Sequence, residues 1–379
     1  MLNVDDLCSV LREAHRVVVK VGSSSITASS GGIDAYQLQA LSTVIAKRWA
    51  AGTQVLLVSS GAIAAGMTPL SLARRPKDLA TQQAAASAGQ GSLMAAYTQA
   101  FSLHGMNVGQ VLLTADDLHR RKHYVNASRT LERLLELEVV PVINENDAVA
   151  TDEIRFGDND RLAALVANLV NADALILLSD VDALYDMHPG EPAASRISTV
   201  RHPEEVVEVD ISVMGSGVGT GGMASKVAAA QMATQEGVTV LVTSAENAAD
   251  ALAGEDVGTY FAPTGERKSA RRRWLAHAAN ARGRLILDRG AVAAVVQRQR
   301  SLLPVGVTAI EGRFVAGDTV ELCDPAGSVV ARGLVNYASG DLAPLVGRRL
   351  DTSAAEHARP RASGRAARTV VRRDDLVVL

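Results

Sequence analysis

The chain has 379 residues, and 47% of them are hydrophobic, which excludes a disordered chain and provides for more than one packed domain. Its two cysteines, Cys8 and Cys323, lie far apart and belong to no metal-binding motif, which predicts reduced, unreactive thiols. No apolar run approaches the ~20 residues that span a bilayer, and the acidic N-terminus does not resemble a signal peptide. We therefore expect a cytoplasmic protein with no membrane partner.

The formal net charge is −3, but it is distributed unevenly along the chain. Residues 1–264 hold 18 Lys and Arg against 30 Asp and Glu, whereas residues 265–379 hold 20 against 11, which gives −12 and +9. This break predicts a first domain over residues 1–264, a linker over 265–282 and a second domain over 283–379. Lysine is scarce, with 6 Lys against 32 Arg, so a lysine in an unusual context is informative.

The first predicted strand, residues 16–22, is an apolar run that carries Lys20 near its end. A lysine inside a buried strand is costly unless its ammonium group meets an anion. Gly22 and the serines after it leave backbone amides beside this charge, and amides with an ammonium group form a phosphate-binding cradle. The alternative is an edge-strand lysine whose ammonium group reaches water.

Helical and strand patterns alternate after this first strand. A second apolar strand ends at Ser60 and Gly61, where a helix begins and offers its amide groups to an anion. A longer helical pattern is expected to be interrupted near Gly89 and Gly91. The alternation predicts an α/β fold, a parallel-sheet αβα sandwich. The ranges are a helix over 33–51, strand 54–60, helix 79–103, strand 108–113 and helix 127–137.

Residues 139–160 hold two polar clusters. A short buried strand turns abruptly into a polar run that ends at Asp147, and a second cluster around Asp160 opens a helix. Parallel sheets bind ligands beyond the carboxyl ends of their strands, so these polar groups stand where a small ligand would bind. If Asp158 or Asn159 is considered alone, we favour the alternative interpretation, a solvated loop whose polar residues form turns and a helix N-cap. Two joined clusters favour a site.

A glycine-rich loop marks the third candidate region. The strand over 174–178 ends in Ser179 and Asp180, and five glycines then occur within residues 215–222. Lys226 begins a helix after them. A glycine-rich loop that leads into a helix is a common phosphate-binding arrangement, although this sequence is not the Walker A pattern. We favour phosphate binding over a flexible surface loop, because this helix start carries one of the few lysines.

Five motifs, in this order, carry a resemblance to a known family: VVVKVGSSSIT, LLVSSGAIAAG, VVPVINENDAVATDEIRFGDND, LLSDVDALY and SGVGTGGMASK. Together they resemble the glutamate 5-kinases of the amino-acid kinase superfamily, whose larger members carry a C-terminal PUA domain. The INENDAV and GTGGM segments separate this branch from aspartokinases, carbamate kinases and uridylate kinases. The resemblance runs from about Arg16 to the C-terminus.

The resemblance implies ATP-dependent phosphorylation of the side-chain carboxylate of L-glutamate, the first step of proline biosynthesis. ATP would enter with Mg²⁺, which phosphates and water mainly hold, so no protein ligand for the metal is expected. Relatives are often dimers or tetramers and are often inhibited by proline, and we expect both properties. The alternative within the fold is another carboxylate or carbamate kinase.

The matching motifs also imply roles for individual residues. Lys20 and Lys226 would contact the transferring phosphate, and Asp160 would organise the two lysines. The residues implied to hold glutamate are Ser60, Asp147, which suits its ammonium group, and Asn159, which suits its carboxyl end. The residues implied to line the nucleotide are Lys20, Ser179, Asp180, Thr220, Gly221, Gly222, Met223, Ala224, Ser225 and Lys226.

Residues 283–379 show short strand patterns separated by glycine turns, with an Arg-rich, less patterned segment at 354–368. This predicts a small β-barrel-like domain similar to PUA, a module of RNA-modifying enzymes. The positive charge fits RNA binding, but one Tyr, one Phe and no Trp are available for stacking, so we favour a structural or regulatory role. Two function classes therefore remain: a metabolic kinase, which the intact lysine set favours, and an RNA-binding protein with a kinase-like scaffold.

Overall fold

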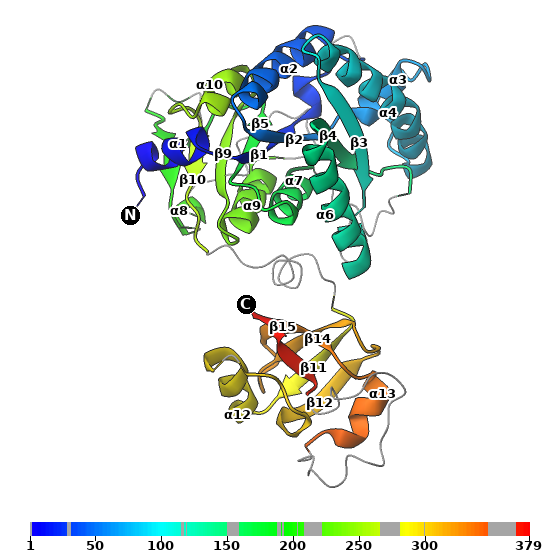
Figure 1. Cartoon of the computed structure of the whole chain (residues 1–379), viewed down its shortest axis with the longest axis vertical. Helices are drawn as coiled ribbons and strands as arrows, with labels where there is room; N and C mark the ends of the chain where they lie inside the picture. The colour runs from blue at the N-terminus through cyan, green and yellow to red at the C-terminus, as the bar shows by residue number, and fades with distance from the viewer. Residues whose placement is uncertain are drawn as a thin grey trace. The chain divides into compact units, whose positions relative to one another are not determined.

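The computed structural model of the chain forms two compact units, which divide near residue 268 (Figure 1). Most of the predicted linker, residues 266–280, lies outside the described residues, so the domain bounds stay predictions. The structure describes residues 2–28, 32–114, 117–118, 120–149, 159–187, 191, 193–202, 204–207, 222–265, 281–298, 300–347 and 369–379.

The first unit is built around one eight-stranded sheet, formed by β1 (Arg16–Val21), β2 (Gln54–Ser59), β3 (Asn107–Leu113), β4 (Val139–Glu145), β5 (Ala174–Ser179), β8 (Thr199–Val200), β9 (Thr239–Ser244) and β10 (Thr259–Phe261). The strand order is β3-β4-β2-β1-β5-β9-β10-β8. Every neighbouring pair from β3 to β9 is parallel, which confirms the predicted parallel sheet. β10 is reversed against β9, and β8 pairs with β10 at the edge.

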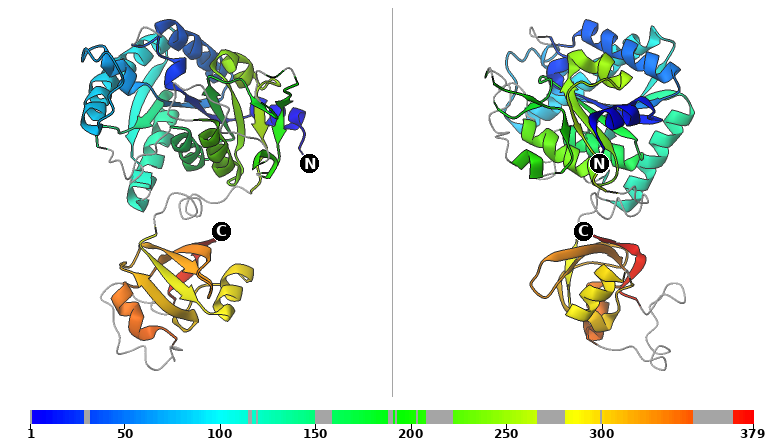
Figure 2. Two further views of the ribbon diagram at one scale, coloured as in Figure 1. Left: turned by 180° about the vertical axis from the view of Figure 1, so that it is seen from behind. Right: turned by 90° about the vertical axis from the view of Figure 1, so that its left-hand side faces the viewer.

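Helices cover both faces of this sheet, as Figures 1 and 2 show. On one face, α1 (Val4–Arg12), α2 (Ala35–Ala50), α4 (Leu79–Ser102) and α10 (Ala248–Ala253) share one apolar core with β1, β2, β4 and β5. The other face carries α6 (Arg121–Glu136), α7 (Asn159–Leu169) and α9 (Met223–Thr234). The short helix α3 (Ala62–Met67) follows β2 and packs against α4.

Side-chain caps fix the starts of three of these helices. Asn3 accepts a hydrogen bond from the backbone of Asp6, whose carboxylate in turn accepts one from the backbone of Asn3, so α1 begins with a capping box. Asp34 caps α2 by accepting from two amides of its first turn, and Asp78 caps α4 by accepting from one. These contacts satisfy amide groups that have no partner inside the helix.

Alternation along β1 decides where its lysine points. Val17, Val19 and Val21 belong to the core shared with α1, α2, α4 and α10. Successive side chains of a strand point to opposite faces, so Val18 and Lys20 point to the other face. Lys20 is therefore directed towards the side of the sheet that α7 and α9 cover.

The segment after β5 forms a small hairpin at the rim of the first unit. β6 (Leu184–Tyr185) and β7 (Arg196–Ile197) pair antiparallel, and α8 (Glu204–Val207) follows β8. Short 3₁₀ turns follow β1 and β9 at η1 (Ser23–Ser25) and η2 (Ala245–Asn247). Within the parts of the chain that the structure describes, no helix is both long and apolar enough to cross a membrane.

The second unit is strand-rich, as predicted, with β11 (Gly283–Leu287), β12 (Val307–Gly312), β13 (Thr319–Cys323), β14 (Val329–Val335) and β15 (Val371–Val378). They form one sheet in the order β12-β11-β13-β14-β15, parallel between β11 and β13 and antiparallel elsewhere. Between them lie α12 (Arg289–Val292), the π-helical turn η4 (Ala293–Gln297), η5 (Pro304–Gly306), α13 (Ser339–Leu342) and η6 (Ala343–Leu345).

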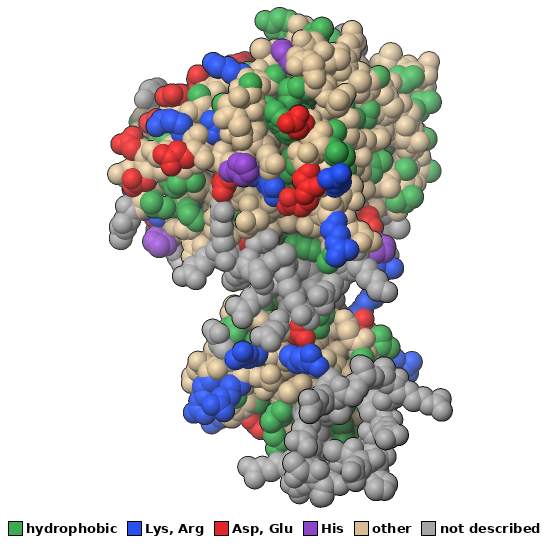
Figure 3. All heavy atoms as spheres, in the orientation of Figure 1, with side chains coloured by type: hydrophobic (Ala, Val, Ile, Leu, Met, Phe, Trp, Pro, Cys, Tyr) green, Lys and Arg blue, Asp and Glu red, His purple; other side chains and the backbone are tan. Residues whose placement is uncertain are grey.

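The second unit has its own core and a basic surface. Leu285, Leu322 and Leu376 are buried in one cluster, which includes none of the residues of the first core. Figure 3 shows several Lys and Arg side chains on the visible face of this unit. The exposed arginines described there include Arg282, Arg284, Arg289, Arg298, Arg300, Arg313, Arg372 and Arg373.

The predicted interruption near Gly89 and Gly91 is wrong, because α4 is one continuous helix of 24 residues. A Cβ atom on Gly89 would lie 1.9 Å from the carbonyl oxygen of Ala62 and 2.3 Å from the amide nitrogen of Gly66. A Cβ atom on Gly66 would lie 1.8 Å from the carbonyl oxygen of Ala85. These glycines therefore allow α3 and α4 to approach closely, and they do not end the helix.

We predict that Gly89→Ala destabilises the protein by about 1–3 kcal/mol, because the added methyl group overpacks a contact between two backbones. The matched control is Gly91→Ala in the same helix, where a Cβ atom would meet nothing within 4 Å. That change is expected to be neutral or to stabilise by up to about 1 kcal/mol. Urea unfolding of both variants measures the difference, and equal stability of the two would contradict the packing explanation.

Candidate active site

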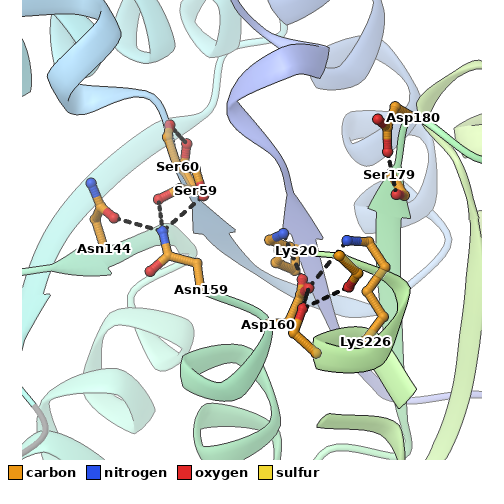
Figure 4. A network of polar contacts seen from close by, with 11 residues as sticks. Lys20, Ser59, Ser60, Asn144, Asn159, Asp160, Ser179, Asp180 and Lys226 are labelled. Carbon is orange, nitrogen blue, oxygen red and sulfur yellow. Dashed lines mark hydrogen bonds and ion pairs between the residues drawn. The ribbon is translucent and has the colours of Figure 1, made fainter. Parts of the chain in front are cut away.

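Four neighbouring strands, β4, β2, β1 and β5, bring the predicted polar residues to one edge of the sheet. Lys20 is the last residue but one of β1, and Ser60 directly follows β2. Asn144 lies near the end of β4, and Ser179 ends β5. Figure 4 shows these side chains with residues of α7 and α9. The edge formed by the carboxyl ends of parallel strands is the expected place for a ligand.

A buried carboxylate joins the two lysines that the sequence singled out. Lys20 Nζ lies 2.5 Å from Asp160 Oδ1, and Lys226 Nζ lies 3.3 Å from Asp160 Oδ2 (Figure 4). The exposed fractions of the side chains are 5% for Lys20, 6% for Lys226 and 0% for Asp160. The three residues come from β1, α9 and α7, so the contact assembles distant parts of the chain.

The charges of this trio do not cancel among themselves. Two ammonium groups face one carboxylate, so the trio carries a net charge of +1. Charges removed from water are costly unless they are paired, and the attraction between them strengthens where water is excluded. The trio is therefore an arrangement that a phosphate group would stabilise further.

The first turn of α9 belongs to the same cluster. α9 begins at Met223, three residues before the predicted start, with Gly222 as its extended N-cap residue. Ser225 Oγ contacts both Asp160 Oδ2, at 3.1 Å, and the carbonyl oxygen of Gly222, at 2.9 Å. Among the residues that the structure describes, a Cβ atom on Gly222 would meet nothing within 4 Å. The amide groups and the helix dipole at this N-terminus attract anions.

A second cluster is centred on Asn159, the residue before Asp160. Its Nδ2 atom donates to the carbonyl oxygen of Ser59 at 3.0 Å, to Ser60 Oγ at 2.9 Å and to Asn144 Oδ1 at 2.9 Å (Figure 4). One side chain thus ties the start of α7 to the ends of β2 and β4. Gly61 completes the turn after Ser60 with a φ of +99°, a left-handed conformation that favours glycine.

Two residues of α4 form hydrogen bonds with members of this cluster, and the sequence analysis missed both. Gln90 Oε1 accepts a hydrogen bond from Asn144 Nδ2 at 3.0 Å. Tyr97 lies seven residues later, on the same side of the helix, and its hydroxyl lies 2.8 Å from Ser59 Oγ. Burial raises the pKa of the Tyr97 hydroxyl, although the hydrogen bond with Ser59 opposes this, so the group stays protonated. The seven-residue spacing was the signal that could have found them.

The remaining predicted residues lie around these two clusters or outside the described residues. Ser179 donates to Asp180 at 3.0 Å at the end of β5, separate from the lysines in Figure 4. Asp147 lies half-buried in the turn after β4. Asp158, Thr220 and Gly221 lie outside the described residues, and Met223 and Ala224 open α9. β4 continues through Asn144 to Glu145, so the polar run that ends at Asp147 begins within the strand.

Two families match this chain. The amino acid kinase family matches residues 15–255, and the PUA domain family matches residues 283–353. The first match covers the strands that carry the site and leaves out β10 of the same sheet, and the second covers most of the strands of the second unit.

Curated relatives match over nearly the whole chain. The glutamate 5-kinase of Streptomyces avermitilis is 57% identical over 369 residues, which cover 97% of this chain and 97% of the relative. The glutamate 5-kinase of Streptomyces coelicolor is 57% identical over 368 residues, with coverage of 97% of both chains. That of Thermobifida fusca is 56% identical over 371 residues, which cover 97% of this chain and 94% of the relative. The chain therefore belongs to the amino acid kinase family and, within it, to the glutamate 5-kinases that carry a PUA domain.

Proposed function

We propose that this chain transfers the γ-phosphoryl group of ATP to the side-chain carboxylate of L-glutamate, the first step of proline biosynthesis. The observation that carries the proposal is the pair of buried lysines, Lys20 and Lys226, that Asp160 holds at the edge of a parallel sheet. Two cations at one point suit a reaction in which two anions, a carboxylate and a phosphate, must meet. Membership of the glutamate 5-kinase family identifies the acceptor.

The chemistry needs alignment and charge neutralisation rather than a covalent intermediate. A carboxylate oxygen of glutamate attacks the γ-phosphorus, the bond between that phosphorus and the β–γ bridging oxygen breaks, and ADP leaves. The acceptor carboxylate is already ionised near neutral pH, so no general base is required. Lys20 and Lys226 reduce the repulsion between the two anions and offset the charge on the group in transfer.

The described residues fit a Mg²⁺ ion that arrives with the nucleotide. Both oxygens of Asp160 face ammonium groups, so this carboxylate is already engaged by the two lysines. Mg²⁺ commonly keeps several waters and binds through substrate phosphates. When bound, it neutralises charge on the β- and γ-phosphates. The nucleotide phosphates would lie at the N-terminus of α9, beside the end of β5.

The Asn159 cluster is the proposed binding site of glutamate. Ser60 Oγ accepts a hydrogen bond from Asn159, so its own proton can be donated to a carboxylate of the substrate. Asn159 holds this turn against α7, and it would anchor the carboxyl end of the substrate by exchanging one of its three present acceptors for a substrate oxygen. Asp147, in the turn after β4, supplies the negative charge that the ammonium group of glutamate requires.

The test is ATP turnover by the full-length protein with glutamate, aspartate and carbamate in separate reactions, trapping any acyl phosphate with hydroxylamine. We expect the hydroxamate from glutamate, with far less from aspartate. Preference for aspartate or carbamate would identify another kinase of the same fold. If the protein does not turn over ATP with any of the three acceptors, the proposed function is contradicted. That result would favour the alternative, an RNA-binding protein with a kinase-like scaffold.

Several properties extend this proposal beyond the chemistry. We propose that the enzyme acts in the cytoplasm, where ATP and glutamate are supplied, that it forms a dimer or tetramer, and that proline inhibits it. We also keep the domain bounds 1–264 and 283–379 as proposals. For the PUA domain we favour a structural or regulatory role over RNA binding, because Phe314 and Tyr337 are its aromatic residues and both are buried.

We predict that Lys20→Ala and Lys226→Ala each lower kcat by at least about a hundredfold, because each removes a cation that stabilises the transition state. Arginine at either position should not restore full activity, since its planar fork differs from a point charge. Lys47→Ala, at an exposed position in α2, is the matched control and should retain kcat. Near-normal turnover by a folded Lys20→Ala or Lys226→Ala variant would exclude the proposed role for that lysine.

We predict that Asp147→Asn raises the KM for glutamate by about ten- to a hundredfold, the range expected for loss of a charge-assisted hydrogen bond of about 1.5–3 kcal/mol. The KM for ATP should change little, because the carboxylate faces the amino acid. Steady-state kinetics in which each substrate is varied in turn measure both constants. An unchanged glutamate KM together with a large loss of kcat would instead place Asp147 on the phosphate side.

A further inference from the structure

A tyrosine hydroxyl lies beneath the turn that carries Ser60. Tyr97 in α4 and Ser59 at the end of β2 are each 0% exposed, and their hydroxyl oxygens are 2.8 Å apart. Ser59 Oγ also donates to the carbonyl oxygen of Ser60 at 3.1 Å. A serine hydroxyl has one proton, so Ser59 must accept from Tyr97, and the order of donation runs from Tyr97 through Ser59 to Ser60.

This chain of hydrogen bonds ends on the carbonyl oxygen of Ser60, and other atoms of the same two serines contact Asn159. Asn159 Nδ2 donates both to the carbonyl oxygen of Ser59 and to Ser60 Oγ. A shift of the Ser59–Ser60 backbone would change the positions of these acceptors relative to Asn159. The Tyr97 hydroxyl therefore restrains the orientation of the turn from the α4 side, while Asn159 restrains it from the α7 side.

Packing alone accounts for the tyrosine ring but not for its hydroxyl. The ring of Tyr97 lies 6.4 Å from that of Phe101 between centroids, within the apolar core shared with Leu93 and Ala100. Phenylalanine would fill the same space without a polar atom in the core. A buried hydroxyl is costly unless it is hydrogen-bonded, so its presence here is explained by its partner Ser59.

We propose that the Tyr97 hydroxyl is a positioning group for the acyl acceptor. It fixes the Ser59–Ser60 turn so that the Ser60 hydroxyl is presented to the carboxylate of glutamate. The inference rests on the proposed function, because it assigns the acceptor side of the site to this turn. Lys20, Asp160 and Lys226 lie on β1, α7 and α9, whereas the Tyr97–Ser59 contact joins α4 to β2. Loss of the Tyr97 hydroxyl should therefore affect binding of the acceptor and not of the nucleotide.

The experiment compares Tyr97→Phe with Tyr260→Phe in the full-length protein. Tyr260 in β10 is also 0% exposed, and its hydroxyl donates to the carbonyl oxygen of Glu255 at 2.7 Å, away from the site. Tyr97→Phe loses the contact with Ser59, and Tyr260→Phe loses the contacts of its hydroxyl with Glu255 and with the Cys8 side chain, so the melting temperature should fall in both variants. Only Tyr97→Phe should raise the glutamate KM, by about three- to tenfold, with the ATP KM and kcat within about twofold of wild type.

Ser59→Ala removes the hydrogen bond with Tyr97 from the other partner, together with the bond from Ser59 Oγ to the carbonyl oxygen of Ser60, and is a second test of the same turn. It should also raise the glutamate KM, and the double variant Tyr97→Phe/Ser59→Ala should exceed the larger single effect by less than about twofold, because both changes break one link. If Tyr97→Phe does not fold, Ser59→Ala alone decides the question.

Three results would overturn the positioning role: an unchanged glutamate KM in Tyr97→Phe, equal KM increases in the two tyrosine variants, or an unchanged KM in Ser59→Ala. Each of these results is interpreted only when the wild-type protein forms the hydroxamate from glutamate. Failure of the wild-type protein to form it would instead refute the proposed function itself.

Discussion

One buried ion-pair cluster, Asp160 with Lys20 and Lys226, connects the fold of this protein to its proposed chemistry. The three residues lie on α7, β1 and α9, and each would be costly to bury without the others. The cluster can form only when both helices pack on the same face of the sheet beside β1. A correctly folded first unit therefore places two ammonium groups at one point, and no separate rearrangement is needed to assemble them.

Two adjacent residues at the start of α7 divide the work of the site. Asn159 contacts the ends of β2 and β4, whereas Asp160 contacts β1 and α9. In the proposed mechanism the first group holds the acceptor and the second holds the phosphate-binding lysines. One helical turn thus sets the spacing between acceptor and donor, which suits a reaction that depends on alignment.

The elements with strong sequence patterns were predictable, and so were the residues that chemistry makes unusual there. A lysine inside the apolar run of β1 and a lysine after a glycine-rich loop have few explanations other than an anion, and the structure brings both to Asp160. Tertiary packing decided the rest. Gly89 was predicted to interrupt the helix, although it permits close contact with α3, and the Tyr97 hydroxyl beside Ser59 was not predicted. The close contact at Gly89 leaves no local signal in the sequence, whereas Tyr97 could have been found from its seven-residue spacing after Gln90.

The central claim is that Asp160 holds the two lysines in the geometry that phosphoryl transfer requires. Its most direct test is the kcat of Asp160→Asn in the full-length protein, measured on folded material at saturating ATP and glutamate. The side chain keeps its shape but loses the charge that both ammonium groups face, so kcat should fall by at least about a hundredfold, while the glutamate KM changes by less than about threefold. A kcat within a few-fold of wild type would show that the lysines act without this carboxylate and would contradict the account.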